Sequence, residues 1–319
     1  RSKNKFRNWR VKMNNVIFTK VTIFRNIKDY KFVPKLEEEK KGEIVDKLTT
    51  ALKGKMSLLN LPSIDDKVKR HLFNMQLINS TYPSLFVSEK DNISLSLFGD
   101  EHIKITATSY GFDKKVFKRA CDLANALSNK INMSYNDQYG YLMSDIKNIG
   151  SGVRLECTIL LPAINRIGKI DQVRQNVKKL GYNLSSTNKS EKYILSTVCN
   201  LGFTESEIVN EFSKMVQKLQ DLEVESAKVY DVEHHDEILD RVYRSQAILN
   251  SAYILQYDEL LSHIKSLIMG LDLGLIDLPQ DCILDLIKLE EAKLDEFISK
   301  GELIDLASKV KDIMKGNKI

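Results

Sequence analysis

The sequence predicts an α+β fold, in which an antiparallel sheet flanked by helices is followed by a small all-helical domain. Two observations lead to this prediction. Up to about residue 230, short segments with alternating apolar and polar residues, the period of a half-buried strand, recur between amphipathic helical segments. From about residue 232 onward the apolar spacing is helical throughout. For a chain of 319 residues we therefore expect two domains, residues 1–230 and 231–319.

Charge and composition are those of an ordinary globular protein. Apolar residues make up 43% and charged residues 29% of the chain, and the net charge is +5. This mild basic excess allows an acidic partner or a nucleotide, but it predicts no nucleic-acid partner. The basic residues within 1–12 are interpreted as a solvated tail.

Cysteine and histidine usage predicts neither a disulfide framework nor a metal site. The four cysteines are scattered without a Cys-x-x-Cys pair, which favours a reducing compartment. His234 and His235 are adjacent, and neighbouring residues point in different directions on a helix. No apolar run reaches membrane-spanning length and no secretory signal is visible. We expect a cytoplasmic protein without membrane contact.

The first strand is predicted at residues 14–26, where two faces alternate. One face carries Ile17, Thr19, Val21 and Ile23, and the other carries Phe18, Lys20, Thr22 and Phe24. Helices are predicted at 36–53 and 65–78. A hairpin follows, with strands at 93–97 and 103–108, and then a helix at 113–130 with Asp113 as its N-cap.

Residues 139–154 form a loop that contains Gly150 and Gly152 and leads into a strand at 153–161. Gly150 and Gly152 allow backbone conformations closed to other residues, and Arg154 is the first polar position of the strand. Two interpretations are open for this segment. The loop could hold an anion with Arg154 aimed at it, or it could simply enter a core strand with Arg154 in a surface ion pair.

The remaining elements are predicted from their periodicity and caps. A helix is expected at 165–180, a loop at 183–191 and a strand at 193–198. Thr204 and Glu207 have the spacing of a capping box, which opens a helix to about residue 226.

The glycine-containing segment resembles the active-site loop of the guanidino phosphotransferases, the creatine and arginine kinases. It is most similar to their bacterial protein-arginine kinase branch, of the McsB type. The matching residues are Gly140-Tyr141-Leu142, Asn148, Gly150, Gly152 and Arg154. Further along, residues 240–244 resemble the Arg-Asp-x-x-Arg motif of that branch's second domain, which the creatine kinases lack.

The resemblance implies a nucleotide site made by basic residues. Lys20, Lys104 and Arg154 fall at positions where the family grips phosphates with arginines. Two further arginine positions carry Thr22 and, approximately, Ser185. The implied cofactor is ATP with magnesium, held more weakly than in the family because the guanidinium fork of arginine is lost at several positions.

The resemblance also assigns candidate acidic residues. Asp100 falls at the position of the family's base, and Asp145 falls where the family has a cysteine near the guanidinium. Asp240 and Arg244 fall in the motif that forms the family's phosphoarginine pocket. Because these two residues are four apart on a helix, a simple i,i+4 ion pair is the open alternative.

Three functional hypotheses follow. We interpret the chain as a catalytically impaired protein-arginine kinase homologue, a pseudokinase that acts as a regulatory or binding subunit beside an active paralogue or a second copy of itself. The alternative is an active kinase that transfers the ATP γ-phosphate to arginine side chains through a rewired site. A third possibility is a module that binds phosphoarginine or nucleotide without transfer.

Overall fold

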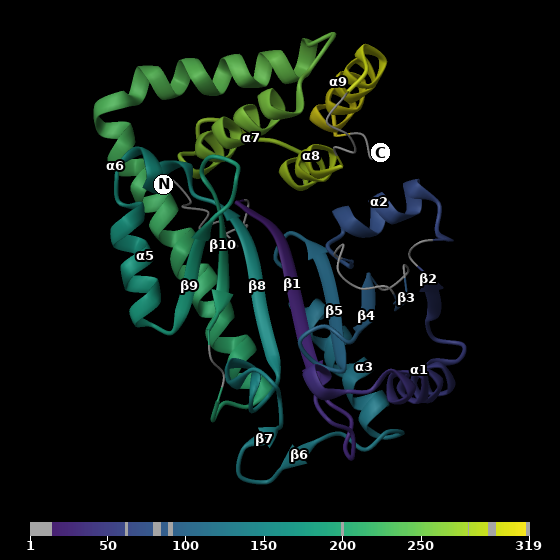
Figure 1. Cartoon of the computed structure of the whole chain (residues 1–319). Helices are drawn as coiled ribbons and strands as arrows, with labels where there is room; N and C mark the ends of the chain where they lie inside the picture. Colours follow the sequence, from purple (N-terminus) through teal and green to yellow (C-terminus); the bar gives the residue numbers. More distant parts are fainter. Residues whose placement is uncertain are drawn as a thin grey trace, which may run out of the picture.

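The computed structural model describes residues 15–60, 63–78, 84–88, 92–198, 201–279, 281–292 and 298–316 (Figure 1). The basic stretch at 1–12 lies outside these ranges. The described residues contain an eight-stranded sheet with the order β2-β3-β4-β5-β1-β8-β10-β9, and each neighbouring pair is antiparallel. The predicted antiparallel sheet is therefore confirmed. Its strands are β1 (Val16–Arg25), β2 (Ser57–Asn60), β3 (Ser84–Ser88), β4 (Ile93–Leu97), β5 (Ile103–Tyr110), β8 (Val153–Leu160), β9 (Tyr182–Ser186) and β10 (Lys192–Thr197).

A small ribbon of β6 (Tyr135–Asn136) and β7 (Gly140–Tyr141) stands apart from the main sheet. The helices are α1 (Glu38–Leu52), α2 (Asp66–Asn74), α3 (Lys115–Ser128), α4 (Pro162–Arg166), α5 (Ile170–Lys179), α6 (Glu205–Ser251), α7 (Tyr257–Asp272), α8 (Cys282–Glu291) and α9 (Lys300–Met314). Two 3-10 turns, η1 (Val33–Lys35) and η4 (Ile146–Asn148), complete the described elements.

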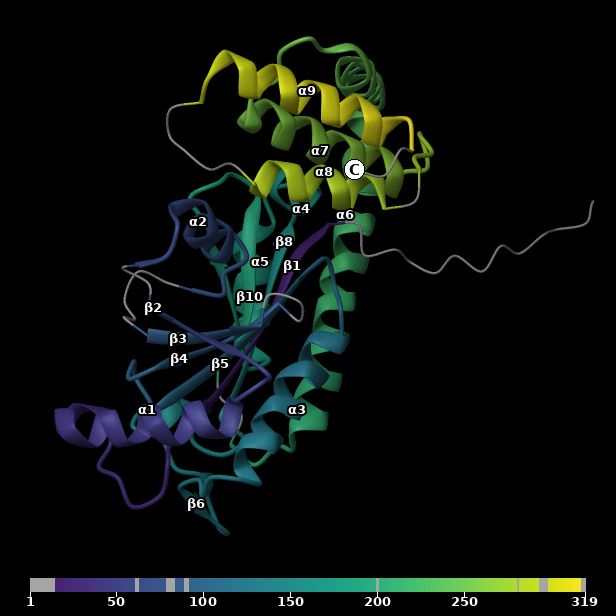
Figure 2. The same ribbon diagram turned by 90° about the vertical axis from the view of Figure 1, so that its right-hand side faces the viewer.

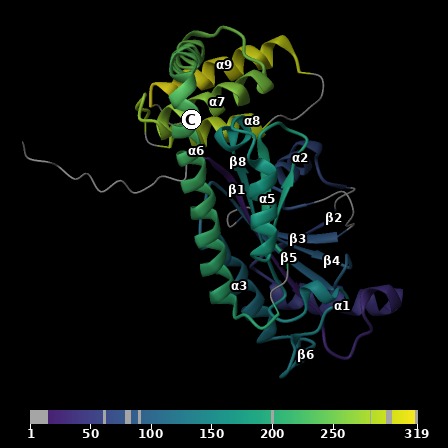
Figure 3. The same cartoon turned by 90° about the vertical axis from the view of Figure 1, so that its left-hand side faces the viewer.

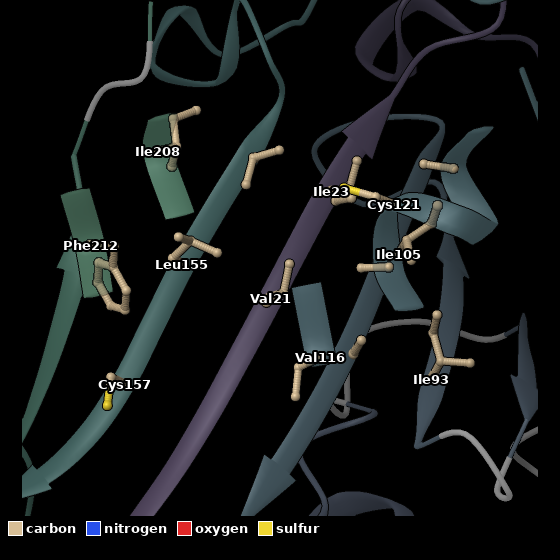
Figure 4. Close-up of a cluster of buried hydrophobic side chains, with 14 of the residues drawn as sticks. Val21, Ile23, Ile93, Ile105, Val116, Cys121, Leu155, Cys157, Ile208 and Phe212 are labelled. Carbon is tan, nitrogen blue, oxygen red and sulfur yellow. The ribbon is translucent and has the colours of Figure 1, made fainter. Parts of the chain in front are cut away.

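One face of the sheet carries the main hydrophobic core. Helices α3 and α6 run along this face, as Figures 2 and 3 show from opposite sides. Figure 4 shows how the core is built: Val21, Ile105 and Leu155 from three strands lie with Val116 of α3 and Phe212 of α6. Burial of these apolar side chains is the main favourable term that holds helices to sheet.

The helical C-terminal region lies beyond one end of the strands (Figure 2). Its helices α7, α8 and α9 form a second apolar cluster with Ile17, Phe18 and Leu160 of the sheet. Ion pairs also connect it to the sheet. Lys265 of α7 lies 3.2 Å from Glu191 in the β9–β10 turn, and Lys189 and Lys192 pair with Glu290 and Glu291 of α8 respectively.

The predicted single helix at 165–180 is wrong. The chain forms α4 and α5, separated at Gly168, whose φ is +70°. The N–H of Gly168 donates to the carbonyl of Asn165, and the N–H of Lys169 donates to the carbonyl of Ile164. These two bonds form a Schellman motif, which ends α4 on a left-handed glycine.

The predicted loop at 183–191 is wrong over its first half. Residues Tyr182–Ser186 form β9, which pairs with β10 and closes the sheet at that edge. Only the short connection at 187–191 is a turn. Leu184 is buried in the core between the half-buried or exposed neighbours Asn183 and Ser185, so the strand period is present but brief.

The predicted end of a helix near residue 226 is also wrong. Helix α6 begins at the capping box of Thr204 and Glu207, which is confirmed, and its 47 residues to Ser251 form two helical segments joined across a kink. Its dihedral angles depart from the helix only at His234, with φ −128° and ψ 23°. The division into residues 1–230 and 231–319 stays a prediction, since α6 runs through the proposed boundary.

The start of α3 differs slightly from the prediction. The helix begins at Lys115, with Lys114 in the N-cap position, rather than at Asp113. The Asp113 carboxylate still accepts a 2.8 Å hydrogen bond from the Lys115 N–H, so it satisfies one of the free donors of the first turn. Among the described helices, none combines the length and apolar character needed to cross a membrane.

Candidate active site

The face of the sheet opposite the core is polar at its centre, over β5, β1 and β8, while Leu85 and Val87 of β3 pack in an apolar cluster with Leu72 of α2. Helices α3 and α6 pass behind the strands in Figure 1, so this polar face is turned toward the viewer. Residues directly opposite in neighbouring strands share a face. Lys20 lies opposite Glu156 and Thr108, and Thr22 lies opposite Arg154 and Thr106. Charged and hydroxyl side chains therefore cover the centre of this face.

The three predicted phosphate-binding cations lie together on this polar face. Lys104 of β5 lies opposite Phe24 of β1, Arg154 of β8 lies opposite Thr22, and Lys20 is on β1 itself. At about 3.3 Å per residue, the stretch of β1 from Lys20 to Phe24 covers about 13 Å. Lys20, Lys104 and Arg154 thus form one cluster, although they come from three strands.

The electrostatics of Lys104 show this clustering. Burial lowers the pKa of the Lys104 ammonium below its usual range, and the positive charges of Lys20 and Arg154 lower it further. The carboxylates of Glu156 and Asp100 oppose this shift. An anion bound among the three cations would relieve the repulsion and favour the charged form of Lys104.

Contacts with neighbouring side chains hold Lys20 and Arg154 on the polar face. The Lys20 ammonium lies 3.0 Å from a carboxylate oxygen of Glu156, and both side chains are half-buried. The Arg154 guanidinium donates a 3.3 Å hydrogen bond to the side-chain oxygen of Asn148, in the glycine-containing loop. It also lies over the ring of Phe24, 5.7 Å from the ring centroid. Arg154 is therefore held at the junction of loop and sheet.

The glycine-containing loop is fixed against the end of β1 by backbone contacts. The Phe24 N–H donates to the Gly152 carbonyl at 2.8 Å, and the Tyr141 N–H donates to the Gly150 carbonyl at 2.8 Å. A Cβ on Gly152 would lie 2.7 Å from the Phe24 carbonyl oxygen, and one on Gly140 would lie 2.6 Å from the Gly150 oxygen. Both positions also have positive φ. Glycine is therefore required by space as well as by conformation.

Arg25 is a structural residue that sequence reasoning missed. Its side chain is fully buried, its Nη1 donates to the carbonyls of Phe24 and Ser151, and its Nη2 pairs with Glu205 at 3.2 Å. Its guanidinium lies 3.5 Å from the centroid of the Tyr141 ring. Burial lowers the pKa of Arg25, while Tyr141 and Glu205 oppose the shift. The position of Arg25 in the first predicted strand, on the same face as Val21 and Ile23, was the available signal.

The two candidate acidic residues lie on neighbouring segments. Asp100 is exposed in the turn between β4 and β5. Asp145 is the N-cap of η4, and its carboxylate accepts a 3.0 Å hydrogen bond from the Lys147 N–H. Glu101, which follows Asp100, accepts a 3.1 Å hydrogen bond from the Asp145 N–H. The turn of Asp100 and the loop of Asp145 are therefore joined through Glu101, close to Lys104 and Arg154.

The two uncharged positions lie at different distances from this cluster. Thr22 is buried in its centre, between Arg154 and Thr106. Ser185 lies on β9, the edge strand, and its hydroxyl donates to the carbonyl of Ile194. Because β8 and β10 separate β9 from β1, Ser185 lies away from the three cations.

Asp240 and Arg244 form the predicted i,i+4 ion pair on α6. Their carboxylate oxygen and guanidinium nitrogen lie 3.4 Å apart, and both side chains are more than half exposed. Their role in a phosphoarginine pocket stays a prediction. His234 and His235 pair with Glu237 and Asp231 instead of sharing a ligand, and within the described ranges no group of three His, Cys, Asp or Glu side chains has metal-binding geometry.

Comparison with known proteins agrees with this geometry. Residues 35–226 match the C-terminal catalytic domain of the ATP:guanido phosphotransferases. Among solved structures, the duplicated taurocyamine kinase from Schistosoma mansoni superposes with a TM-score of 0.59 and 22% identity, over 66% of this chain and 33% of that one. Lombricine kinase has the same TM-score at 18% identity, over 66% of each chain. The chain belongs to the ATP:guanido phosphotransferase family.

The C-terminal region narrows this assignment. Residues 235–317 match the C-terminal domain of the protein-arginine kinase McsB. The protein-arginine kinase of an Exiguobacterium species is 26% identical over 275 residues, covering 82% of this chain and 79% of its own length. The corresponding kinase of Clostridium novyi is 25% identical over 97% of this chain and 98% of its own. Within its family, the chain is therefore of the McsB type.

Proposed function

We propose that this chain is a protein-arginine kinase, which transfers the γ-phosphoryl group of ATP to arginine side chains of proteins. The observation that carries the proposal is the grouping of Lys20, Lys104 and Arg154 on one polar face, beside the segments of Asp100 and Asp145. The relatives named protein-arginine kinase support the same function, because they align with most of the chain.

The residues of the polar face fit the two charged reactants. Two ammonium groups and one guanidinium match the negative charge of a triphosphate, and a bound phosphate would offset the repulsion among Lys20, Lys104 and Arg154. Carboxylates are the natural partners of a guanidinium. Asp100 and Asp145 therefore fit an arginine side chain at the end of the sheet where the glycine-containing loop begins.

In this proposal the chain's own residues position and stabilise charge. ATP would supply the phosphoryl group, and the magnesium that accompanies it would neutralise part of the phosphate charge. Lys20, Lys104 and Arg154 would hold the phosphates, and Asp145 would orient the acceptor guanidinium. Asp100 would accept the proton that the attacking guanidinium nitrogen loses as its bond to the γ-phosphorus forms, while the bond from that phosphorus to the β,γ-bridging oxygen breaks and ADP leaves.

A second candidate function is a catalytically impaired subunit that regulates or binds a partner. Two contacts favour it: Lys20 is already paired with Glu156, and the Asp145 carboxylate is engaged in capping η4. The partner would be an active paralogue or a second copy of this chain. Purification of the protein from its native host would then recover an intact kinase with it. For either function we propose a cytoplasmic location.

Labelling of an arginine-rich protein with γ-labelled ATP separates the two candidates. We expect acid-labile phosphoarginine to accumulate, and Asp100→Ala and Arg154→Ala each to abolish it. The controls Asp305→Ala and Arg174→Ala remove the same charges from α9 and α5 and should retain the activity. If the wild-type protein binds ATP but forms no phosphoarginine, transfer is excluded and the regulatory function is favoured.

A further inference from the structure

Glu101 lies at the centre of the connection between the two candidate acidic residues. Its side chain is 1% exposed. Its carboxylate accepts hydrogen bonds from the N–H of Ser144, 2.9 Å from each carboxylate oxygen, and from the N–H of Asp145 at 3.1 Å. The third donor is the side-chain amide of Asn26, the residue that follows β1, at 2.5 Å. Three segments of the chain thus meet on one carboxylate.

The neighbouring His102 fixes this arrangement from the other side. The N–H of His102 donates to the side-chain oxygen of Asn26 at 2.8 Å, which leaves the Asn26 amide group facing Glu101. The Nδ1 atom of His102 accepts from the N–H of Ile27 at 3.0 Å, so Nε2 must carry the proton that is shared with the Lys31 carbonyl at 2.8 Å. The turn therefore has one defined orientation relative to β1.

The partners of Glu101 are all donors. Two backbone N–H groups and one amide group point at its two oxygens. A carboxylate accepts from all three, whereas the amide of Gln would turn one acceptor into a donor. Because Asp100 directly precedes Glu101 and Asp145 donates to it, any movement of the Glu101 carboxylate changes the separation of Asp100 from Asp145.

We propose that Glu101 is a positioning residue that sets Asp100 and Asp145 for the arginine substrate. The inference rests on the proposed kinase function and assigns Glu101 no contact with either substrate. We therefore expect substitution of Glu101 to affect the part of the site that holds the arginine substrate. The phosphate-binding cations are on the strands, and their register does not depend on the Glu101 carboxylate.

The variant Glu101→Gln tests this role because the new amide must face a donor. One donor–donor contact displaces the loop at Ser144 and Asp145. Misplacement of reacting groups by about 1 Å costs on the order of 100-fold in rate, so we expect kcat for arginine phosphorylation to fall about 10- to 100-fold. The KM for ATP should change by less than about twofold, since binding of the nucleotide is unaffected. Glu101→Asp keeps the charge and should recover part of kcat.

Glu223→Gln is a control for the same substitution at another buried carboxyl group. Glu223 of α6 also has a buried carboxyl group that accepts two backbone N–H bonds, and its donors, Ala163 and Ile164, are at the start of α4. The Glu223→Gln variant should leave kcat/KM unchanged both for ATP and for the arginine substrate. The inference is overturned if Glu101→Gln retains the wild-type kcat, if it weakens ATP binding as much as it lowers kcat, or if Glu101→Asp recovers nothing.

Hydrogen exchange tests the inference independently of activity. In the protein without nucleotide, the amides of Ser144 and Asp145 should exchange faster in Glu101→Gln than in wild type, while amides of β10 keep their rates. If wild-type protein makes no phosphoarginine, the proposed function fails and this measurement still decides the positioning role. Unchanged exchange at both amides would overturn it. If Glu101→Gln does not fold, the same comparison is made between wild type and Glu101→Asp, for which faster exchange of the Ser144 and Asp145 amides than in wild type is expected.

Discussion

Lys20 shows how one residue of the polar face is shared between two possible partners. Its ammonium is paired with Glu156 directly across the β1–β8 ladder. A phosphate group bound at this face would compete with that carboxylate for the same cation. Since both side chains are half-buried, the pair contributes modestly, on the order of 1 kcal/mol or less.

Removal of the Glu156 charge should therefore strengthen nucleotide binding. In Glu156→Gln the Lys20 ammonium is released and repulsion of the phosphates ends, so we expect the Kd for ATP to fall about 3- to 10-fold. Calorimetric titration measures it. Glu211→Gln, which removes a carboxylate paired with Lys214 on the surface of α6, is the control and should leave the Kd unchanged. Equal or weaker binding by Glu156→Gln would contradict this competition.

Gly152 shows a second kind of constraint at the residue scale, set by space. Its φ is +64°, and a Cβ there would meet the Phe24 carbonyl oxygen at 2.7 Å and Arg25 Nη1 at 2.8 Å. Gly168 has nearly the same φ, +70°, with nothing within 4 Å. The two glycines therefore separate the cost of backbone conformation from the cost of crowding.

We expect Gly152→Ala to lower the free energy of unfolding by about 3 kcal/mol or more, because strain and overpacking add. Gly168→Ala should cost only the left-handed conformation, about 1–2 kcal/mol. Urea denaturation of both variants measures the difference. Similar losses for the two variants would show that the loop accommodates the added methyl group.

Residues differ in how far the sequence reveals them. Strand alternation and the family resemblance predicted Lys20, Lys104 and Arg154, and the structure gathers them on one face. The contacts of Arg25 with Ser151 and Glu205 were not predictable, because they join side chains 126 and 180 positions apart. Periodicity reports which face a residue occupies, and it carries no information on partners across the fold.

At the scale of elements, the turn between β4 and β5 is the most constrained connection beside the candidate site. It carries Asp100, Glu101 and His102, and only Asp100 is exposed. Burial lowers the pKa of His102, whose Nδ1 accepts the Ile27 N–H and is therefore unprotonated. The turn is built around a neutral imidazole.

This geometry predicts a loss of stability in acid. Because the folded pKa of His102 lies below the unfolded value of about 6.5, its contribution is complete above that pH and is lost as pH falls toward the folded pKa. The free energies of unfolding of wild type and His102→Gln should therefore differ more at pH 7.5 than at pH 5.5, with a slope of at most about 1.4 kcal/mol per pH unit. Urea denaturation at both pH values measures the difference. An equal difference in the free energy of unfolding at pH 7.5 and pH 5.5 would mean that His102 has the same pKa in the folded and unfolded states.

Elements were predicted well where their apolar period is long and poorly where a single residue ends them. The strands around β1 and the hairpin of β4 and β5 were confirmed. The Schellman motif at Gly168 ends α4 and so divides the helix predicted at 165–180. The apolar period of these residues does not reveal the two hydrogen bonds of that motif. Strand β9 was taken for a loop because only Leu184 among its five residues is buried.

At the scale of the whole molecule, the sheet has two faces with different uses. One face is closed by α3 and α6 over the apolar core, and the other presents a basic cluster beside an acidic turn and loop. The C-terminal helices lie at the end of the strands, opposite the glycine-containing loop (Figure 1). The sequence predicted the antiparallel sheet and the helical C-terminal region, but not the kinked helix α6 that connects them.

The central claim is that the polar face binds the phosphates of ATP, and a calorimetric titration with ATP tests it most directly. We expect wild-type protein to bind, and Arg154→Met to bind about 10-fold more weakly or worse because a charged, multidentate donor is lost. Arg174→Met, a control on α5, should match wild type. Equal affinity of Arg154→Met and wild type, or no binding by wild type, would contradict the claim.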